Sequence, residues 1–124
     1  MPVSFLTGQI VWVLQAMAQR PDVLIELYPD TVNAAVELGD DWLDAYDIAE
    51  HQQLLIGSDI EEIDAFVRAR IGNPQFWKQD ALAGHADWQY LRTQARQALE
   101  ARGLATEKPD RSKNEYIFGP PSPD

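Results

Sequence analysis

The sequence predicts an all-α protein, a single compact bundle of five to seven helices with an extended, Pro-rich C-terminal tail packed on it. Three observations lead to this prediction. Apolar residues recur with the helical period, glycine or proline follows most of these runs, and no strand pattern precedes the tail. The 124 residues include four Trp, four Tyr and four Phe, enough large side chains for one buried core. The helical domain is expected at residues 1–104 and the tail at residues 105–124.

The first half of the chain is expected to form four helices. Ser4 can cap the first, which is apolar nearly all round and therefore suits a central place in a bundle. Pro21 breaks that helix and begins a short second one. Gly39 is expected to end the third helix in a left-handed conformation, and Gly57 to close the fourth. The expected ranges are 5–19, 21–28, 31–38 and 40–55.

Three further helices are expected in the second half, at residues 58–71, 74–83 and 86–102. Ser58 and Glu61 have the spacing of a capping box, in which each side chain bonds the backbone N–H of the other residue. The helix that they begin has an apolar stripe at Ile60, Ile63, Val67 and Ile71. Helix stops are expected at Gly72, Gly84 and Gly103. Arg92 and Arg96, one turn apart on the last helix, are expected to project outward.

The tail is expected to be extended because its prolines exclude a helix. Chain ends are usually frayed unless something holds them. Tyr116, Ile117 and Phe118 are too apolar to be left in water, and we expect these side chains to dock on the helical body.

Negative charge is concentrated in one block of the sequence. The formal net charge is −10, and thirteen of the twenty carboxylates but none of the ten Lys and Arg residues lie between Pro21 and Asp64. They are Asp22, Glu26, Asp30, Glu37, Asp40, Asp41, Asp44, Asp47, Glu50, Asp59, Glu61, Glu62 and Asp64. Such charges repel one another, so they must be solvated, offset elsewhere in the fold, or met by a cationic partner.

The composition excludes several classes of function. A strongly acidic chain is a poor binder of nucleic acids or of anionic membranes, which both require Lys and Arg. The absence of cysteine excludes disulfides, thiolate metal sites and cysteine nucleophiles, and it fits a reducing cytoplasm. No Lys or Arg precedes Arg20, so the apolar start does not have the charge pattern of a secretory signal. We therefore expect a cytoplasmic protein that does not enter membranes.

The helix expected at residues 40–55 offers the clearest candidate surface. Helical spacing places Trp42, Ala45, Tyr46 and Ala49 on one side and Asp40, Asp44, Asp47 and His51 on the other. The residues that we expect to bind a partner are Glu37, Asp40, Asp41, Trp42, Asp44, Asp47 and Glu50. An exposed tryptophan beside this face would be a good interface anchor, and Trp42 and Trp77 are the candidates.

Catalytic and metal-binding patterns are weak. Asp47 and His51, four residues apart, could share a divalent cation, but a solvated helix end explains them as well. Asp64 and Glu37 lie nearest to apolar stripes and are the best candidates for general acid-base chemistry, although simple solvation is favoured for both. No serine lies in a Gly-x-Ser-x-Gly motif, and His85 lies near a helix start, which disfavours its charged form. We expect no cofactor and no enzymatic activity.

Three functions remain open. The first is a small binding protein that masks a basic partner protein, as bacterial immunity proteins and antitoxins do; the likeness is one of charge and size alone. The second is a structural domain whose acidic part packs against its arginines, within the chain or across a homodimer. The third is an enzyme or small-molecule binder whose site is assembled from distant residues.

Overall fold

The computed structural model describes residues 6–53 and 57–110, and within these ranges the fold is all-helical, as predicted. Six helices and no strand are present in the described ranges. The helices are α1 (Gly8–Met17), α2 (Pro21–Glu26), α3 (Ala34–His51), α4 (Ser58–Arg68), α5 (Ala81–Gly84) and α6 (Ala86–Ala101). None of the helices in these ranges has the length and apolar character needed to cross a membrane.

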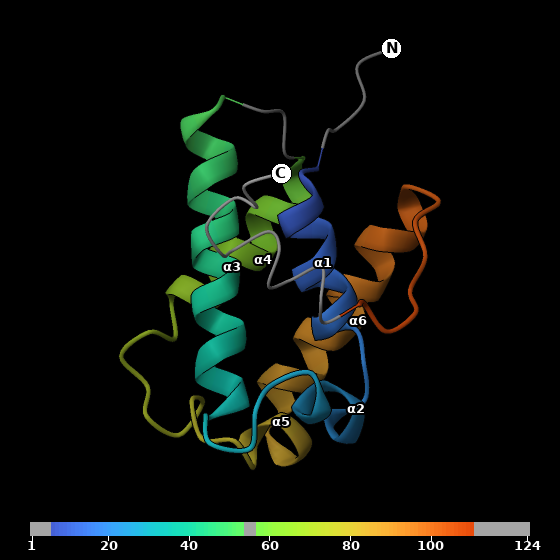
Figure 1. Ribbon diagram of the computed structural model, residues 1–124. Helices are drawn as coiled ribbons and strands as arrows, with labels where there is room; N and C mark the ends of the chain where they lie inside the picture. The colour runs from blue at the N-terminus through green and yellow to red at the C-terminus, as the bar shows by residue number, and fades with distance from the viewer. Residues whose placement is uncertain (1–5, 54–56, 111–124) are drawn as a thin grey trace, which may run out of the picture.

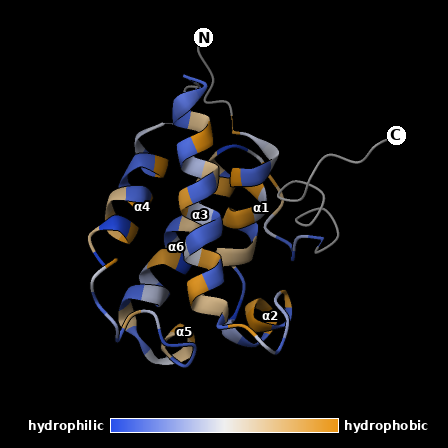
Figure 2. Ribbon diagram, turned by 60° about the vertical axis from the view of Figure 1, so that its left-hand side comes forward, coloured by the Kyte–Doolittle hydropathy of each residue, from blue (hydrophilic) through white to orange (hydrophobic). Residues whose placement is uncertain are grey.

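Four of these helices form a bundle around one core (Figure 1). α1 packs against both α3 and α6, and α4 packs against the same two helices from the opposite side. The short α2 and α5 contact each other and lie together at one end of the bundle, at the bottom of both ribbon views. Most hydrophobic residues of the long helices are buried in the core, and Figure 2 shows where they lie along each ribbon. The predicted central place of α1 is confirmed, since residues around most of its circumference are buried.

The start of α4 differs from the prediction. Gly57, with φ +96°, occupies the N-cap position that we expected for Ser58, and Ser58 becomes the first helical residue. No side chain caps this helix end, so the predicted capping box is wrong. A glycine accepts the positive φ that the chain needs here, which leaves the hydroxyl of Ser58 one position too late to cap. The prediction that Gly57 closes the preceding helix is also wrong, because α3 ends at His51.

Gly39 lies inside a helix, although it was predicted to end one. α3 runs without interruption from its cap at Asn33, whose side chain accepts from the backbone N–H of Ala35 at 2.9 Å. Gly39 is buried, and the ring of Trp77 lies directly against it. A Cβ at this position would overlap the Trp77 ring. The glycine is therefore used for close approach of a neighbouring segment, at the cost of about 1 kcal/mol in helix propensity.

The helix predicted at residues 74–83 is mostly a series of turns, and only α5 remains of it. Backbone carbonyls that a helix would use internally accept bonds from side chains instead. Trp88 Nε1 donates to the Phe76 carbonyl at 2.7 Å, and the side chain of Asn33 donates to the Trp77 carbonyl at 2.9 Å. Phe76 is fully buried and stacks on Trp88 with ring centroids 4.4 Å apart. Packing of these aromatic rings overrides the local helix signal.

The two arginines that were predicted to project outward from α6 bond backbone carbonyls just after α1, and Arg92 also bonds one in α5. Arg92 donates to the carbonyls of Gln19 and Leu82, both at 3.0 Å, and Arg96 donates to the carbonyl of Ala18 at 3.1 Å. Cations at a helix C-terminus satisfy carbonyls that have no partner within the helix. Burial, and then the charge of Arg96, lowers the pKa of Arg92.

The described beginning of the tail, residues 105–110, lies along α1. Gln15 and Gln19 donate to the carbonyls of Ala105 and Thr106 at 3.0 and 2.9 Å. Trp12 Nε1 donates to the carbonyl of Asp110 at 2.7 Å. The predicted docking of Tyr116, Ile117 and Phe118 falls outside the described residues. The prediction that Ser4 caps the first helix is wrong, because α1 begins at Gly8 and its N-cap is Thr7, whose side chain accepts from the backbone N–H of Ile10 at 3.1 Å.

Candidate functional site

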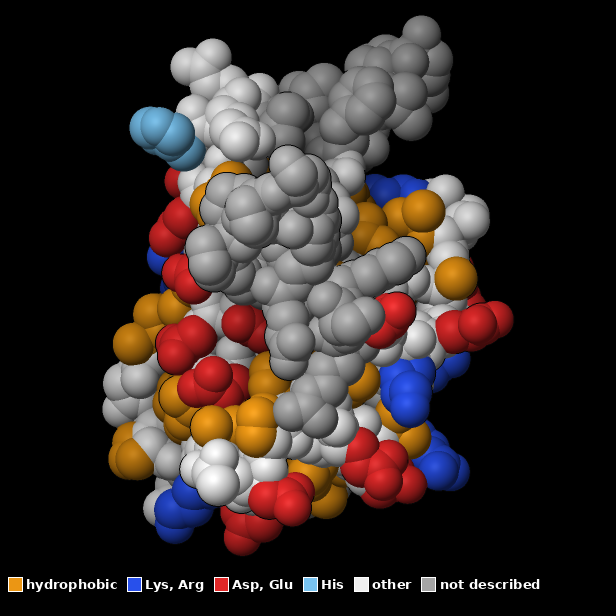
Figure 3. Space-filling model, in the orientation of Figure 1, with side chains coloured by type: hydrophobic (Ala, Val, Ile, Leu, Met, Phe, Trp, Pro, Cys, Tyr) orange, Lys and Arg blue, Asp and Glu red, His pale blue; other side chains and the backbone are white. Residues whose placement is uncertain are grey.

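The solvent-facing side of α3 carries six carboxylates, which we call the acidic surface. The predicted inward stripe is confirmed, because Trp42, Ala45, Tyr46 and Ala49 are all buried. The acidic surface is formed by Glu37, Asp40, Asp41, Asp44, Asp47 and Glu50. Glu37 and Asp41 are half-buried and the other four residues are exposed. Figure 3 shows acidic side chains gathered over α3, on the left of the view, with hydrophobic side chains between them.

Trp42 does not belong to this surface, and its expected role as an exposed anchor is wrong. The side chain is 0% exposed and lies in the core. Its indole Nε1 donates to Asp64 Oδ1 at 3.1 Å, and its ring stacks near Tyr46. The same spacing that aligns it with Ala45 and Ala49 turns it inward. Trp42 therefore fixes α3 on the bundle and is not available to a partner.

A chain of polar contacts links Trp42 to the surface. Asp64, only 7% exposed, also accepts from Arg68 Nε at 2.7 Å, and Arg68 in turn donates to Asp47 Oδ1 at 2.7 Å. The hydrogen bond to Asp64, and then that to Asp47, raises the pKa of Arg68. Asp64 is thus bonded twice within the fold, which gives it a structural use in place of acid-base chemistry. Asp47 at the surface is offset by Arg68.

Asp41 is also used within the fold. The hydroxyl of Tyr28 donates to Asp41 Oδ2 at 2.8 Å and ties the segment after α2 to α3. Burial raises the pKa of Tyr28 far above its ordinary value, and the charges of Asp41 and Glu37 add to that shift. Tyr28 therefore remains a neutral donor at any physiological pH.

The remaining carboxylates of the acidic surface differ from Asp41 and Asp47 in their pairing. Glu37, Asp40, Asp44 and Glu50 form no ion pair with the part of the chain that the structure describes. In the same part, arginines pair with four carboxylates of the acidic block, Asp22, Asp47, Asp59 and Asp64. Ion pairs among the described residues therefore offset a minority of the charge in the block.

An apolar groove borders the acidic surface. Val36 and Leu43 of α3 line one side, and Ile71 and Trp77 of the connection between α4 and α5 line the other. Gly39 and Asp40 complete its lining, and its volume is about 210 Å³. Ile71 was predicted in the inward stripe of α4, but α4 ends at Arg68 and Ile71 is 53% exposed. The other tryptophan candidate, Trp77, is half-buried and lines this groove.

Sequence reasoning missed the groove because half of it comes from a segment predicted to be helical. A local signal was present on α3, where Val36 and Leu43 are seven residues apart and therefore share a face. Gly39 lies between them and supplies no side chain to fill the space. The partner segment across the groove could not be identified from spacing.

The weak metal and catalytic candidates gain no support. Among the described residues, no group of three or more His, Asp or Glu side chains is placed to hold a metal ion. Asp47 bonds Arg68, and His51 is exposed in the last turn of α3. The predicted pair is thus not assembled into a site with a third ligand in this part of the chain.

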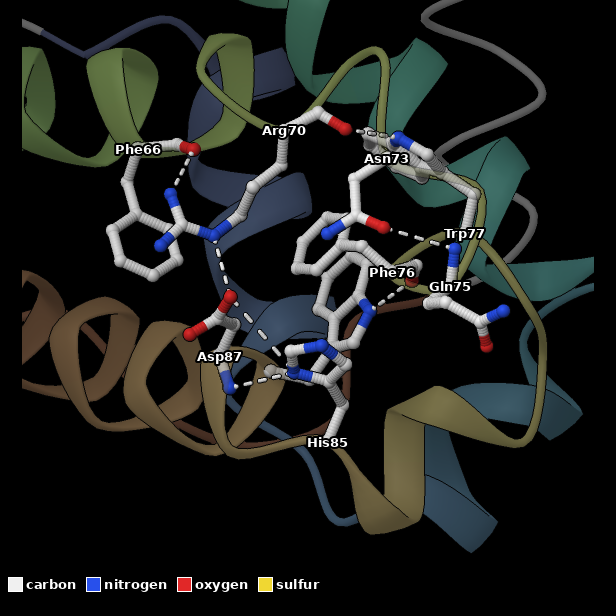
Figure 4. Close-up of polar contacts among 9 residues, drawn as sticks. Phe66, Arg70, Asn73, Gln75, Phe76, Trp77, His85 and Asp87 are labelled. Carbon is white, nitrogen blue, oxygen red and sulfur yellow. Dashed lines mark hydrogen bonds and ion pairs between the residues drawn. The ribbon is translucent and has the colours of Figure 1, made fainter.

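His85 belongs to a group of side chains that contact one another within the fold (Figure 4). Its Nδ1 accepts from the backbone N–H of Asp87 at 3.1 Å and caps α6. The Asp87 carboxylate accepts from Arg70 Nε at 2.7 Å, and the Arg70 guanidinium lies 3.3 Å from the centroid of the Phe66 ring. These contacts join the ends of α4 and α6. The predicted proximity of His85 to a helix start is confirmed, and the cap requires an unprotonated Nδ1.

Comparison of the chain with protein-family models, with curated proteins and with solved structures finds no significant match. Function is therefore inferred from the chain's own residues. Most of the described polar clusters are explained by packing, capping or ion pairing within the bundle. The four carboxylates of the acidic surface that have no ion pair in the described chain, and the groove beside them, are not; α3 carries these carboxylates and one wall of the groove.

Proposed function

We propose that this protein binds a basic partner protein through the acidic surface of α3 and masks it, as an immunity protein or antitoxin does. The observation that supports this proposal is the contrast in pairing between the two signs of charge. Glu37, Asp40, Asp44 and Glu50 have no ion pair in the described chain, whereas every described arginine is bonded within it. The described part of the chain therefore leaves negative groups, and few positive ones, for an external partner.

The acidic surface has the physical properties that such binding requires. Its carboxylates project from a single helix that is held by the buried Trp42 and by the Tyr28 to Asp41 hydrogen bond. Fixed charges of one sign attract an oppositely charged protein before contact and increase its association rate. Because salt screens these interactions over about 10 Å at 0.1 M, binding should weaken and slow as salt increases.

Binding of a second copy of this chain to the acidic surface is less favourable than binding of a basic partner. Two copies would each bring a net charge of −10 to the contact. The described arginines that could offset it already bond carboxylates or backbone carbonyls, and their release would break contacts of the bundle. A partner with its own unpaired Lys or Arg residues requires no such rearrangement.

The experiment compares two variants of equal charge. In the surface variant, the four carboxylates without ion pairs are neutralised: Glu37→Gln, Asp40→Asn, Asp44→Asn and Glu50→Gln. In the control variant, four exposed carboxylates elsewhere are neutralised: Asp30→Asn, Glu61→Gln, Glu62→Gln and Glu100→Gln. Both remove the same number of negative charges. Each immobilised protein is exposed to a lysate of the producing host and washed with graded salt, and retained proteins are identified and then produced pure.

We expect a basic protein to be retained by the wild type and by the control and to be lost by the surface variant. With that protein purified, the association rate should fall roughly tenfold or more between low and high salt for the wild type. Equal losses with both variants would show that only net charge matters, and an undiminished signal with the surface variant would contradict the proposal.

A further inference from the structure

The groove beside the acidic surface is built from two separate segments and held from both sides. Its α3 wall is fixed by the bundle, and its other wall is fixed by Trp77, whose Nε1 donates to the Arg70 carbonyl at 2.8 Å. The Trp77 carbonyl in turn accepts from the side chain of Asn33, next to the start of α3. Close contact of the Trp77 ring with Gly39 joins the two walls. The groove therefore exists before any partner binds.

The size and lining of the groove indicate what it can hold. Its volume of about 210 Å³ is below the roughly 300–1,000 Å³ of typical small-molecule pockets and suits one large side chain. Four of its six lining residues are apolar side chains, and two of these, Val36 and Ile71, are 37% and 53% exposed. Covering them would remove apolar surface from water, which is the main source of favourable free energy in protein association.

Negative charge borders the same groove. Asp40 lines it directly, and Glu37 and Asp44 lie one turn of α3 before and after Asp40. None of the three carboxylates has an ion pair in the described chain. An occupant that carries an acidic residue beside its apolar side chain would be repelled, and one that carries Lys or Arg would be attracted.

We infer that the groove receives a single aliphatic or aromatic side chain of the basic partner, flanked by Lys or Arg residues that pair with Asp40 and its neighbours. This inference rests on the proposed function and adds the local chemistry of the partner. In an interface of this kind the apolar side chain supplies much of the affinity and the flanking cations fix its direction. The acidic surface attracts the partner, and the groove discriminates among basic partners.

Three synthetic peptides test the inference without knowledge of the natural partner. They are acetyl-Lys-Lys-Leu-Lys-Lys-amide, the same peptide with Ser in place of Leu, and acetyl-Glu-Glu-Leu-Glu-Glu-amide. Titration is followed by NMR of the labelled protein. We expect the Lys-Leu peptide to shift the methyl signals of Val36, Leu43 and Ile71 and to bind roughly tenfold tighter than the Lys-Ser peptide, the fold-change expected from burial of one leucine. The Glu-Leu peptide should not bind.

Two exposed residues of α3 provide matched variants. Val36 is 37% exposed and lines the groove, whereas Ile48 is 38% exposed and lies outside it. Val36→Ser should bring the Leu-to-Ser affinity ratio close to one, and Ile48→Ser should leave that ratio unchanged. Asp40→Asn should weaken both lysine peptides about equally, by a few-fold. All three substitutions are at exposed positions, so the fold should be retained.

Failure of this inference is distinguishable from failure of the proposed function. Equal binding of the Leu and Ser peptides, or NMR signal shifts that avoid Val36 and Ile71, would overturn the inferred role of the groove. The acidic surface would still stand as a site for a basic partner. If neither lysine peptide binds at any salt concentration, both this inference and the proposed function are overturned. A dimer in sedimentation that Val36→Ser removes would make a second copy the occupant and overturn the inference.

Discussion

Carboxylates on two sides of the bundle are used in different ways. On the side formed by α4 and α6, Asp59 accepts from Arg102 at 2.7 and 2.8 Å, Asp64 pairs with Arg68, and Asp87 pairs with Arg70. On α3, four carboxylates have no such partner in the described chain. The density of acidic residues in a sequence does not separate these two uses. Glu61, Glu62 and Glu100 on α4 and α6 also have no ion pair in the described chain, so the indication of a binding surface is the grouping of four such carboxylates on α3 beside the apolar groove.

The largest expected effect comes from removing the buried member of the paired group. Asp64→Ala should lower the free energy of unfolding by about 2–4 kcal/mol, because it leaves the Trp42 indole and the Nε of Arg68 without their acceptor. The lower part of that range is favoured, since the Arg68 side chain is 39% exposed and water can replace part of the bond. Denaturation by urea measures the change.

Asp44→Ala is the matched control on the other side of the comparison. Asp44 is exposed and has no ion pair in the described chain, so its removal should change the free energy of unfolding by less than about 0.5 kcal/mol. Losses of similar size in Asp64→Ala and Asp44→Ala would remove the proposed distinction between the two sides.

A smaller effect, with a defined pH dependence, is expected at Asp59. Its hydrogen bond from Arg102 holds the pKa of the carboxyl below its ordinary value of 3.8. The ion pair therefore stabilises the fold above about pH 4, and that stabilisation is lost as the pH falls through the lowered pKa. Asp59→Asn should cost about 1 kcal/mol at neutral pH, a modest value because the Asp59 side chain is 40% exposed.

Thermal melts between pH 2 and 7 check this prediction. The difference in melting temperature between wild type and Asp59→Asn should be constant near neutrality and shrink below about pH 4. Glu62→Gln, at an exposed position on α4, should show neither the loss nor the convergence. A difference that persists unchanged to pH 2 would mean that packing, not charge, accounts for the cost.

The smallest expected effect is a slight stabilisation of the fold. Asp40 and Asp44 are four residues apart on α3, where like charges repel by about 0.2–0.5 kcal/mol. Neutralising both, as Asp40→Asn with Asp44→Asn, should raise the melting temperature slightly and reduce its dependence on salt. A decrease in melting temperature at low salt would show that these carboxylates support the fold after all.

Features set by local periodicity were predictable from the sequence. The helical class, the central α1 and the inward stripe of Trp42, Ala45, Tyr46 and Ala49 depend on spacing along one helix, and the structure confirms all three. Five of the six carboxylates on the expected binding surface lie within one helix that was predicted at residues 40–55, so most of that surface was predictable from the sequence.

Features set by contacts between distant segments were not predictable. The place of Gly39 inside α3 was not predictable, because the residue that requires a glycine there, Trp77, lies 38 positions later. The hydrogen bond that holds Trp42 in the core was not predictable, because its acceptor, Asp64, belongs to another helix. The groove depends on both the continuity of α3 and the early end of α4. Each requires knowledge of which side chains meet in space.

The uneven burial of the four tryptophans has a practical consequence. Trp12, Trp42 and Trp88 are at most 3% exposed, whereas Trp77 is half-buried and lines the groove. Acrylamide in solution should therefore quench the fluorescence of Trp77 and leave the emission of the other three largely intact. Trp77 is thus an intrinsic fluorescent reporter of the groove. Protection of its emission from acrylamide by a bound protein would show, without any added label, that the groove is occupied.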